Sequence, residues 1–142
     1  MQTHKPAAGY RVAETRAPGY LHATITGANT SENIRGYMRD LLEACRATGA
    51  RYLLVEERLD GPRLRTIDVY ELVVAGAEDA RGRLAAVAYV DVNAIDDSMM
   101  KFAESVAVSR GVLVKVFSTV PAAKEWIATK ANLAPLAAAR AI

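Results

Sequence analysis

The sequence predicts an α/β fold with a mostly parallel, five-stranded sheet and four main helices. Short apolar runs of strand length alternate along the chain with longer segments that have apolar residues at helical spacing, a pattern typical of βα units. Two short runs flank Pro18 and Gly19, which predicts a hairpin and an antiparallel strand at the N-terminal end of the sheet. The later strands are expected to be parallel and joined by right-handed crossovers.

The hairpin and the first helix have the clearest patterns. Apolar and polar residues alternate over residues 21–26, so one face of this strand is expected in the core. Residues 29–49 carry one apolar stripe over three turns, which predicts an amphipathic helix. Thr30 or Ser31 can cap its start, and Gly49 suits its end.

The second half of the chain continues the alternation. The expected elements are a strand at 51–57, a helix at 65–82, a strand at 84–92, a helix at 96–111, a strand at 112–118 and a helix at 119–131. In the helix at 65–82 the residues expected to face inward are Ile67, Tyr70, Val73, Val74 and Ala77. Two of the strands are apolar on both faces, so we expect either helices on both sides of the sheet or self-association, such as a homodimer.

Length and composition indicate one small domain. With 142 residues the chain can bury a core; we expect a flexible N-terminus over residues 1–9, a single domain over residues 10–130 and an alanine-rich tail over residues 131–142. The net charge of +2 argues against nucleic acid or a membrane surface as a partner. The chain has neither a signal-peptide core nor an apolar run approaching the about 18 residues of a membrane helix, so we expect a cytoplasmic protein.

No motif in the sequence names a reaction. Glycine-rich phosphate loops and the G-x-S-x-G turn are absent. Cys45 is the single cysteine and lies on the apolar stripe of the first helix, so we expect a core residue and no disulfide. His4 and His22 fall on separate elements, which argues against a zinc site. We expect no catalytic residue, no metal ligand set and no cofactor.

Four segments carry a family resemblance. They are "YRVAETRAPGYLHATITG", "TSENIRGYMRDLLEACRATG", "YLLVEERLDGPRLRTIDVYEL" and "VKVFSTVPAAKEWI". In their order and size these segments resemble a STAS domain, the fold of the anti-sigma factor antagonists, and more closely the divergent bacterial branch of stand-alone STAS-like proteins. The resemblance covers roughly residues 10–130.

The resemblance implies a βα superhelix that works by binding partner proteins and not by catalysis. A regulatory kinase or an anti-sigma-like protein is the kind of partner that it implies. In the antagonists, a kinase phosphorylates a serine in an Asp-Ser-Ser-Gly-like sequence at the start of the second helix. This chain has "GPRLRTIDV" there, with Thr66 as the nearby hydroxyl and without the family's motif.

The first site hypothesis follows from that position. It places protein contacts on the turn and helix start at Asp60, Arg63, Arg65, Thr66 and Tyr70. Thr66 is favoured as an ordinary helix N-cap. The alternatives are a phosphorylation site, or an anion site formed by the helix N-terminus with the two arginines.

The second hypothesis uses carboxylates that follow two strands. They are Glu56, Glu57, Asp91 and Asp96. If the strands are parallel neighbours, these residues meet at the carboxyl edge of the sheet, where open α/β sheets place ligands. Such a cluster would hold Mg²⁺ or a small polar ligand. The competing interpretation is that the glutamates are solvated and that Asp96 or Asp97 caps the next helix.

A third feature is a set of methionine and aromatic residues. Its members are Tyr37, Met38, Met99, Met100 and Phe102, and they are suited to line a lipid-sized pocket because methionine adapts to irregular ligands. Their helical spacing favours ordinary core packing for most of them.

Overall fold

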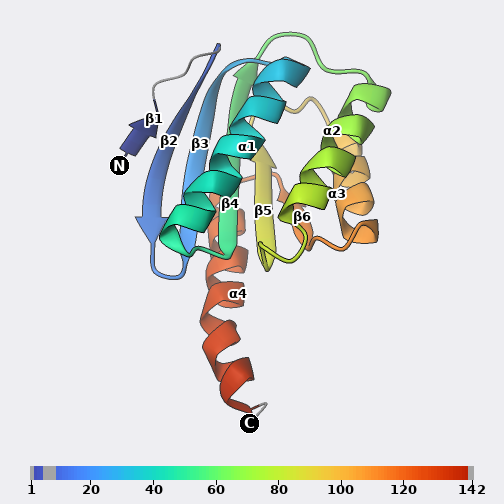
Figure 1. Ribbon diagram of the computed structural model, residues 1–142. Helices are drawn as coiled ribbons and strands as arrows, with labels where there is room; N and C mark the ends of the chain where they lie inside the picture. The colour runs from blue at the N-terminus through green and yellow to red at the C-terminus, as the bar shows by residue number, and fades with distance from the viewer. Residues whose placement is uncertain (1, 5–8, 141–142) are drawn as a thin grey trace.

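The sheet positions all other elements of the molecule. The computed structural model describes residues 2–4 and 9–140, with side chains over residues 9–132. Within these residues the strands lie side by side in chain order (Figure 1): β1 (Gln2–His4), β2 (Tyr10–Ala17), β3 (Tyr20–Ala28), β4 (Tyr52–Asp60), β5 (Ala86–Asp91) and β6 (Val114–Phe117). The helices are α1 (Ser31–Thr48), α2 (Thr66–Ala80), α3 (Ser98–Ser109) and α4 (Val120–Arg140).

The strand directions confirm the predicted fold class. β1, β2 and β3 pair antiparallel, and every pairing from β3 to β6 is parallel. The five expected strands are present, and β1 adds a short strand at the edge that the sequence did not predict. The register of β4 and β5 places Val55 opposite Tyr89 and Glu57 opposite Asp91. These four side chains therefore share one face of the sheet.

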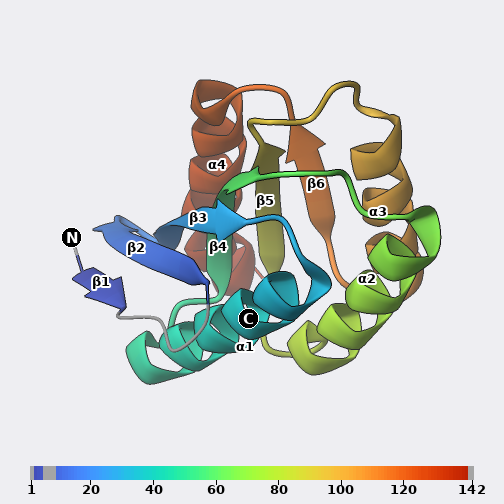
Figure 2. The same ribbon diagram turned by 90° about the horizontal axis from the view of Figure 1, so that it is seen from above.

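Helices cover both faces of the sheet. α1, α2 and α3 lie on one side, and α4 lies on the other (Figure 2). The core under α4 includes Leu54, Ala88 and Ile127, whereas the opposite core includes Leu53 and Val55. Because consecutive residues of a strand point to opposite faces, the two cores draw on alternate positions of β4. This confirms the expectation of cover on both sides and explains why the first half of β4 and most of β5 are apolar on both faces.

α1 forms where its sequence signals place it. Thr30 is the N-cap, and its hydroxyl accepts a hydrogen bond from the backbone N–H of Asn33 at 3.1 Å. Gly49 ends the helix with φ of 75°, a left-handed conformation that favours glycine. Tyr37 and Cys45 are buried on the face toward the sheet. The apolar stripe of the sequence thus becomes the buried face of the helix.

α2 differs from its sequence expectation. It packs mainly against α1 and α3 on its two sides. Ile67 is 51% exposed and Tyr70 is 37% exposed, so both face outward and the expectation that they face inward is wrong. Ala77 is buried as expected, and Leu72, which was not among the expected inward residues, is buried as well. Apolar residues surround this helix, so their spacing did not identify a single buried face.

The two ends of the chain are described in part. α4 continues as one helix to Arg140, through most of the expected alanine-rich tail, and extends beyond the edge of the sheet (Figure 1). Residues 1, 5–8 and 141–142 of the expected terminal segments lie outside the described residues. The expected domain bounds stay a prediction.

Candidate functional site

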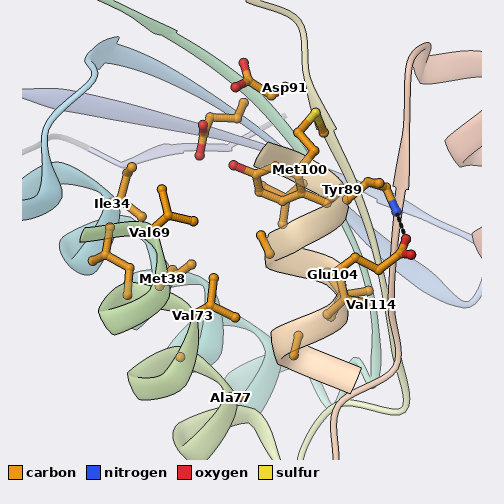
Figure 3. Close-up of a pocket in the computed structure, with 18 of the residues that line it drawn as sticks. Ile34, Met38, Val69, Val73, Ala77, Tyr89, Asp91, Met100, Glu104 and Val114 are labelled. Carbon is orange, nitrogen blue, oxygen red and sulfur yellow. Dashed lines mark hydrogen bonds between the residues drawn. The ribbon is translucent and has the colours of Figure 1, made fainter. Parts of the chain in front are cut away.

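A large cavity lies between α2 and the sheet. Its volume is about 520 Å³, it is partly open to solvent, and residues of α1, α2 and α3 line it together with residues of β4, β5 and β6 (Figure 3). Most of its wall is apolar and comes from all of these elements, including Ile34, Met38, Val69, Val73, Met100 and Val114. The cavity exists because α2 is held by its neighbouring helices and packs little against the strands below it.

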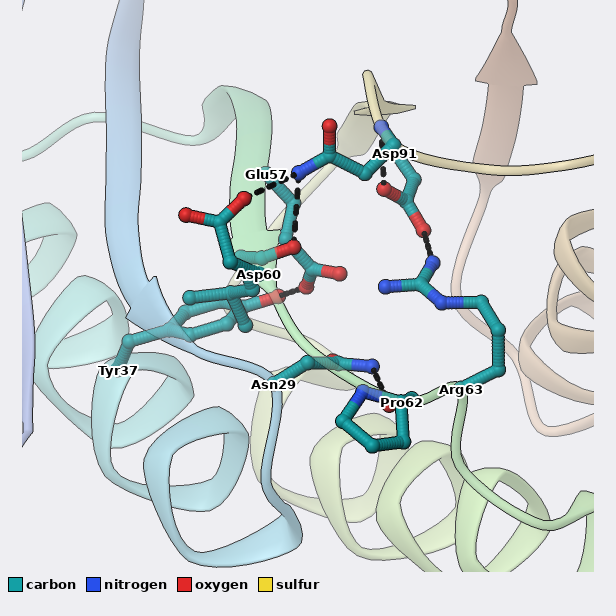
Figure 4. Close-up of polar contacts among 9 residues, drawn as sticks. Asn29, Tyr37, Glu57, Asp60, Pro62, Arg63 and Asp91 are labelled. Atoms are coloured by element: carbon teal, nitrogen blue, oxygen red, sulfur yellow. Dashed lines mark hydrogen bonds and ion pairs between the residues drawn. The ribbon is translucent and has the colours of Figure 1, made fainter.

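The cavity has a polar end at the carboxyl edge of the sheet. Tyr89 and Asp91 of β5 lie at this end in Figure 3, and Glu57 of β4 also lines it. Glu57 is 3% exposed, and its carboxylate accepts a hydrogen bond from the Tyr37 hydroxyl of α1 (Figure 4). The cavity therefore joins an apolar chamber to a small buried group of hydroxyls and carboxyls.

Burial controls the protonation of this group. Desolvation raises the pKa of Glu57, the nearby charge of Asp91 adds to the rise, and hydrogen bonding by Tyr37 and Tyr89 opposes it. Desolvation and the charge of Glu57 also raise the pKa values of Tyr37 and Tyr89 well above the usual range of tyrosine. Ionisable groups with shifted pKa values inside a cavity are typical of functional sites.

An ion pair stands beside the polar end. The Arg63 guanidinium in the turn after β4 donates to the Asp91 carboxylate at 2.8 Å (Figure 4). Asp91 also accepts from the backbone N–H of Asn93 at 3.0 Å. Asn29 donates to the carbonyl of Pro62 at 2.8 Å, which ties the turn to the segment before α1. The turn that begins α2 is thus fixed to both neighbouring elements.

The far wall of the cavity has its own polar contact. Glu104 of α3 accepts a hydrogen bond from the backbone N–H of Val116 at 2.8 Å (Figure 3). β6 is the last strand of the sheet in the described residues, so this N–H has no neighbouring strand to bond. The carboxylate satisfies the strand edge and holds α3 against β6.

The predicted contact residues at the start of α2 are exposed. Arg65, Thr66 and Tyr70 all lie on the surface, as does Asp60. Arg65 pairs with Asp68 at 2.9 Å, so both arginines of the first hypothesis already have carboxylate partners. This weakens the case for a free anion site at the helix start.

Thr66 is not the helix cap that the sequence predicts. The N-cap residue is Arg65, whose backbone carbonyl accepts from the N–H of Val69 at 3.1 Å, and no side chain caps the helix. Thr66 is the first residue inside the helix. Its hydroxyl cannot take the N-cap position because the chain turns into helical geometry one residue earlier than expected.

The tyrosine of the first hypothesis is already partnered. The Tyr70 hydroxyl accepts from the Arg110 guanidinium at 2.9 Å, which links α2 to the end of α3.

The structure brings together some of the predicted carboxylates. Glu57 and Asp91 meet at the cavity, and Asp96 also lines it. Asp96 accepts from the backbone N–H of Ser98 at 2.9 Å and so serves the start of α3. Glu56 points to the opposite face of the sheet, where it pairs with His22 at 2.8 Å. Glu56 does so because it is adjacent to Glu57 in an extended strand.

A metal site does not form from these residues. Across the residues that the structure describes, no group of three or more His, Cys, Asp or Glu side chains is placed to hold an ion. Cys45 is buried, as expected of a core residue, and desolvation raises the pKa of its thiol to about 11. Among the described residues, no helix is both long and apolar enough to cross a membrane.

The sequence analysis did not predict the position of the cavity or the role of Tyr89 at its polar end. The set of methionine and aromatic residues was the nearest signal: Tyr37, Met38, Met99 and Met100 line the cavity, and Phe102 does not. A further signal was available in the strand at 84–92, where Tyr89 is the one residue able to donate a side-chain hydrogen bond from within an apolar run.

Comparison with known proteins gives a likeness of fold. No model of a known protein family matches the chain, and no curated protein matches it significantly. Among solved structures, the chain is similar to an uncharacterized protein from the DUF3478 family with a SpoIIAA-like fold, from Shewanella loihica PV-4. The two chains are 19% identical, the match covers 87% of this chain and 98% of that chain, and the TM-score is 0.49.

The fold assignment itself rests on the strand order, strand directions and helix placement described above.

Proposed function

We propose that this chain is a STAS-like, non-enzymatic binding module that holds a small, mainly apolar molecule in the cavity under α2. The observation that carries the proposal is the cavity of about 520 Å³ with apolar walls and a few polar groups at one end. Pockets for small ligands have this size and this distribution of polarity. Ordinary cores are packed without voids much larger than a water molecule, so a space of this size requires an explanation.

The cavity volume sets the size of the ligand. At about 30 Å³ per non-hydrogen atom, the volume of one water molecule in the liquid, the cavity holds roughly 17 such atoms. A ligand of this size that gains about 0.3 kcal/mol per atom binds with about 5 kcal/mol, a Kd of roughly 0.2 mM. That affinity is within reach of a fluorescence titration.

The arrangement of α2 suggests how the ligand enters. α2 is held by α1 and α3, and its first turn is fixed by the ion pair of Arg63 with Asp91. Its inner side chains, including Val69 and Val73, face the cavity (Figure 3). The cavity is already partly open to solvent, so a ligand can enter without breaking any strand pairing, and a bound ligand stabilises the folded chain by mass action.

The test uses a neutral dye, N-phenyl-1-naphthylamine, whose fluorescence rises in apolar surroundings. We expect the wild-type protein to bind it, and Val73→Phe to weaken binding by about tenfold or more because the larger ring fills the cavity. Val74→Phe is the matched control, since Val74 has the same side chain on the same helix and does not line the cavity. Absence of dye binding to the wild type, or equal binding to both variants, would reject the proposal.

Native mass spectrometry gives an independent readout. Protein purified gently from its source organism is weighed in the native and then in the denatured state. A native mass above the denatured mass of the same chain, lost in Val73→Phe and kept in Val74→Phe, supports a ligand in the cavity. If the excess of native over denatured mass is the same in both variants as in the wild type, the bound molecule lies elsewhere.

A second candidate function is a protein contact at the start of α2. The observation that favours it is the exposure of Ile67 at 51% and Tyr70 at 37% on one helix beside the predicted contact residues. Exposed apolar side chains that gather in this way mark interaction sites more often than scattered ones do. A kinase or an anti-sigma-like partner, phosphorylation of Thr66 and a homodimer all stay predictions.

Site-specific crosslinking tests this second candidate. A photoreactive amino acid replaces Ile67 in cells of the source organism, and the same amino acid replaces the exposed Glu78 on the same helix as the control. We expect one recurrent crosslinked protein from position 67 and none from position 78. The same products from both positions, or none from either, would exclude a specific contact at this surface.

A further inference from the structure

The lining of the cavity has more carboxyl groups (Glu57, Asp79, Asp91, Asp96 and Glu104) than guanidinium groups (Arg35, Arg39 and Arg63). Glu57 and Asp91 supply two carboxyls at the polar end, and Asp96 supplies a third on the cavity wall. Arg63 is the cation whose charge lowers the pKa of Glu57, and its guanidinium already donates a hydrogen bond to Asp91. The other groups facing Glu57 are the hydroxyls of Tyr37 from α1 and Tyr89 from β5.

These groups differ in what they can offer a ligand. The Glu57 carboxyl already accepts from the Tyr37 hydroxyl and still has lone pairs for a further donor, because both of its oxygens can accept hydrogen bonds. The Tyr37 hydroxyl uses its proton on Glu57. The guanidinium that would bind an anionic head group is engaged by Asp91 at 2.8 Å. The end of the cavity therefore presents acceptors more readily than donors.

We propose that the cavity selects an apolar ligand whose head group donates a hydrogen bond to Glu57, a hydroxyl or a protonated primary amine, and discriminates against a carboxylate on the same chain. This inference rests on the proposed function. A carboxylate head would stand beside the Asp91 carboxylate and would further disfavour the ionised form of Glu57, which is 3% exposed. A donor head meets an acceptor already placed at the end of the apolar chamber.

The ion pair of Arg63 with Asp91 sets this preference. The Asp91 carboxylate pairs with the Arg63 guanidinium and also adds negative charge to the site. Its removal would therefore free the guanidinium for an anionic head group and remove one repelling charge. Asp91→Asn is therefore expected to convert the cavity from rejecting a carboxylate to accepting one. Asp68→Asn is the matched control, because it also removes one carboxylate partner of an arginine, Arg65, at a position outside the cavity lining.

The experiment is displacement of the bound N-phenyl-1-naphthylamine by three compounds with one ten-carbon chain: decan-1-ol, decylamine and decanoate. At about pH 7 the amine is protonated and the acid is ionised. We expect the alcohol and the amine each to displace the dye at concentrations about tenfold or more below those needed for decanoate. No order is expected between alcohol and amine, since the amine loses more hydration on entry.

Three variants extend the test. We expect Asp91→Asn to bind decanoate about tenfold more tightly than the wild type, and Asp68→Asn to leave decanoate binding unchanged. We expect Glu57→Gln to weaken the amine about tenfold and the alcohol less, because the amide keeps an acceptor and loses the charge. Thermal unfolding of each variant confirms that it is folded.

The outcomes separate the two proposals. If the dye binds and Val73→Phe abolishes its binding, the cavity is a binding site whatever the head-group result. Equal displacement by all three compounds, displacement by none, or a preference for decanoate in the wild type would overturn the head-group inference alone. Failure of the dye to bind would overturn the proposed function and this inference with it.

Discussion

Tyr37→Phe is the substitution that most directly tests the buried polar group. Tyr37 is 1% exposed, and its hydroxyl donates to the carboxylate of Glu57, which is 3% exposed. Phenylalanine keeps the ring, so the change removes one hydrogen bond and leaves no large void. A hydrogen bond to a charged group contributes about 1.5–3 kcal/mol, and one between neutral groups contributes about 0.5–1.5 kcal/mol.

The sign of the pH dependence follows from the pKa of Glu57. Burial raises this pKa in the folded state, so the carboxyl favours folding when it is protonated. That contribution is complete below the pKa of the unfolded chain and is lost as the pH rises through the folded pKa. Loss of the Tyr37 donor disfavours the ionised form further. We therefore expect Tyr37→Phe to cost about 1 kcal/mol at acidic pH and about 2 kcal/mol at alkaline pH.

Urea unfolding at about pH 5 and about pH 8 measures these two values, within the linear dependence of the free energy of unfolding on denaturant. Tyr10→Phe is the matched control, because the Tyr10 hydroxyl donates to Asp40 at a partly exposed site. We expect it to cost about 0.5–1 kcal/mol. In the background of Glu57→Gln, the pH dependence of Tyr37→Phe should disappear. A cost that is the same at both pH values in the wild-type background would refute the description of Glu57 as a buried, titrating carboxyl.

Two further predictions concern helices that border the cavity. Thr30→Ala removes the capping hydrogen bond from the backbone N–H of Asn33 and should lower the free energy of unfolding in urea by about 1 kcal/mol. Thr66→Ala should change it by less than about 0.5 kcal/mol, because no side chain caps α2. Equal costs would show that Thr66 is a cap after all. Gly76→Ala should raise the free energy of unfolding by about 0.5–1 kcal/mol, because alanine favours the helix more than glycine does. The new Cβ would lie 3.2 Å from the Sδ atom of Met38, and this flexible side chain can shift toward the cavity. A lower melting temperature than the wild type would show that Met38 cannot shift.

Local patterns were reliable where one element decides its own structure. The start of α1 at Thr30, its end at Gly49 and its buried face follow from capping chemistry and from one apolar stripe. The alternation of apolar and polar residues around Ile25 likewise predicted a strand with one buried face. The need for cover on both sides of the sheet followed from strands that are apolar on both faces, and α4 supplies that cover.

Local patterns failed where the outcome depends on several elements. The apolar residues of α2 cover much more than one face, and only its packing between α1 and α3 determines that Leu72 is buried and Ile67 exposed. Glu56 and Glu57 were grouped as one carboxylate cluster, yet the period of two along a strand sends them to opposite faces of the sheet. The alternation of side chains along a strand is enough to predict this separation from the sequence.

Apart from β1, the order and type of the elements follow from the sequence alone, because hydrophobic periodicity, caps and turn residues act over a few neighbouring positions. The tertiary structure alone decided that Glu57 lies opposite Asp91 and meets Tyr37, since these contacts join residues far apart in the chain through strand register and helix packing. It also decided that α2 stands away from the sheet and leaves a cavity. A cavity depends on how several elements pack against one another, so no local sequence pattern predicts it.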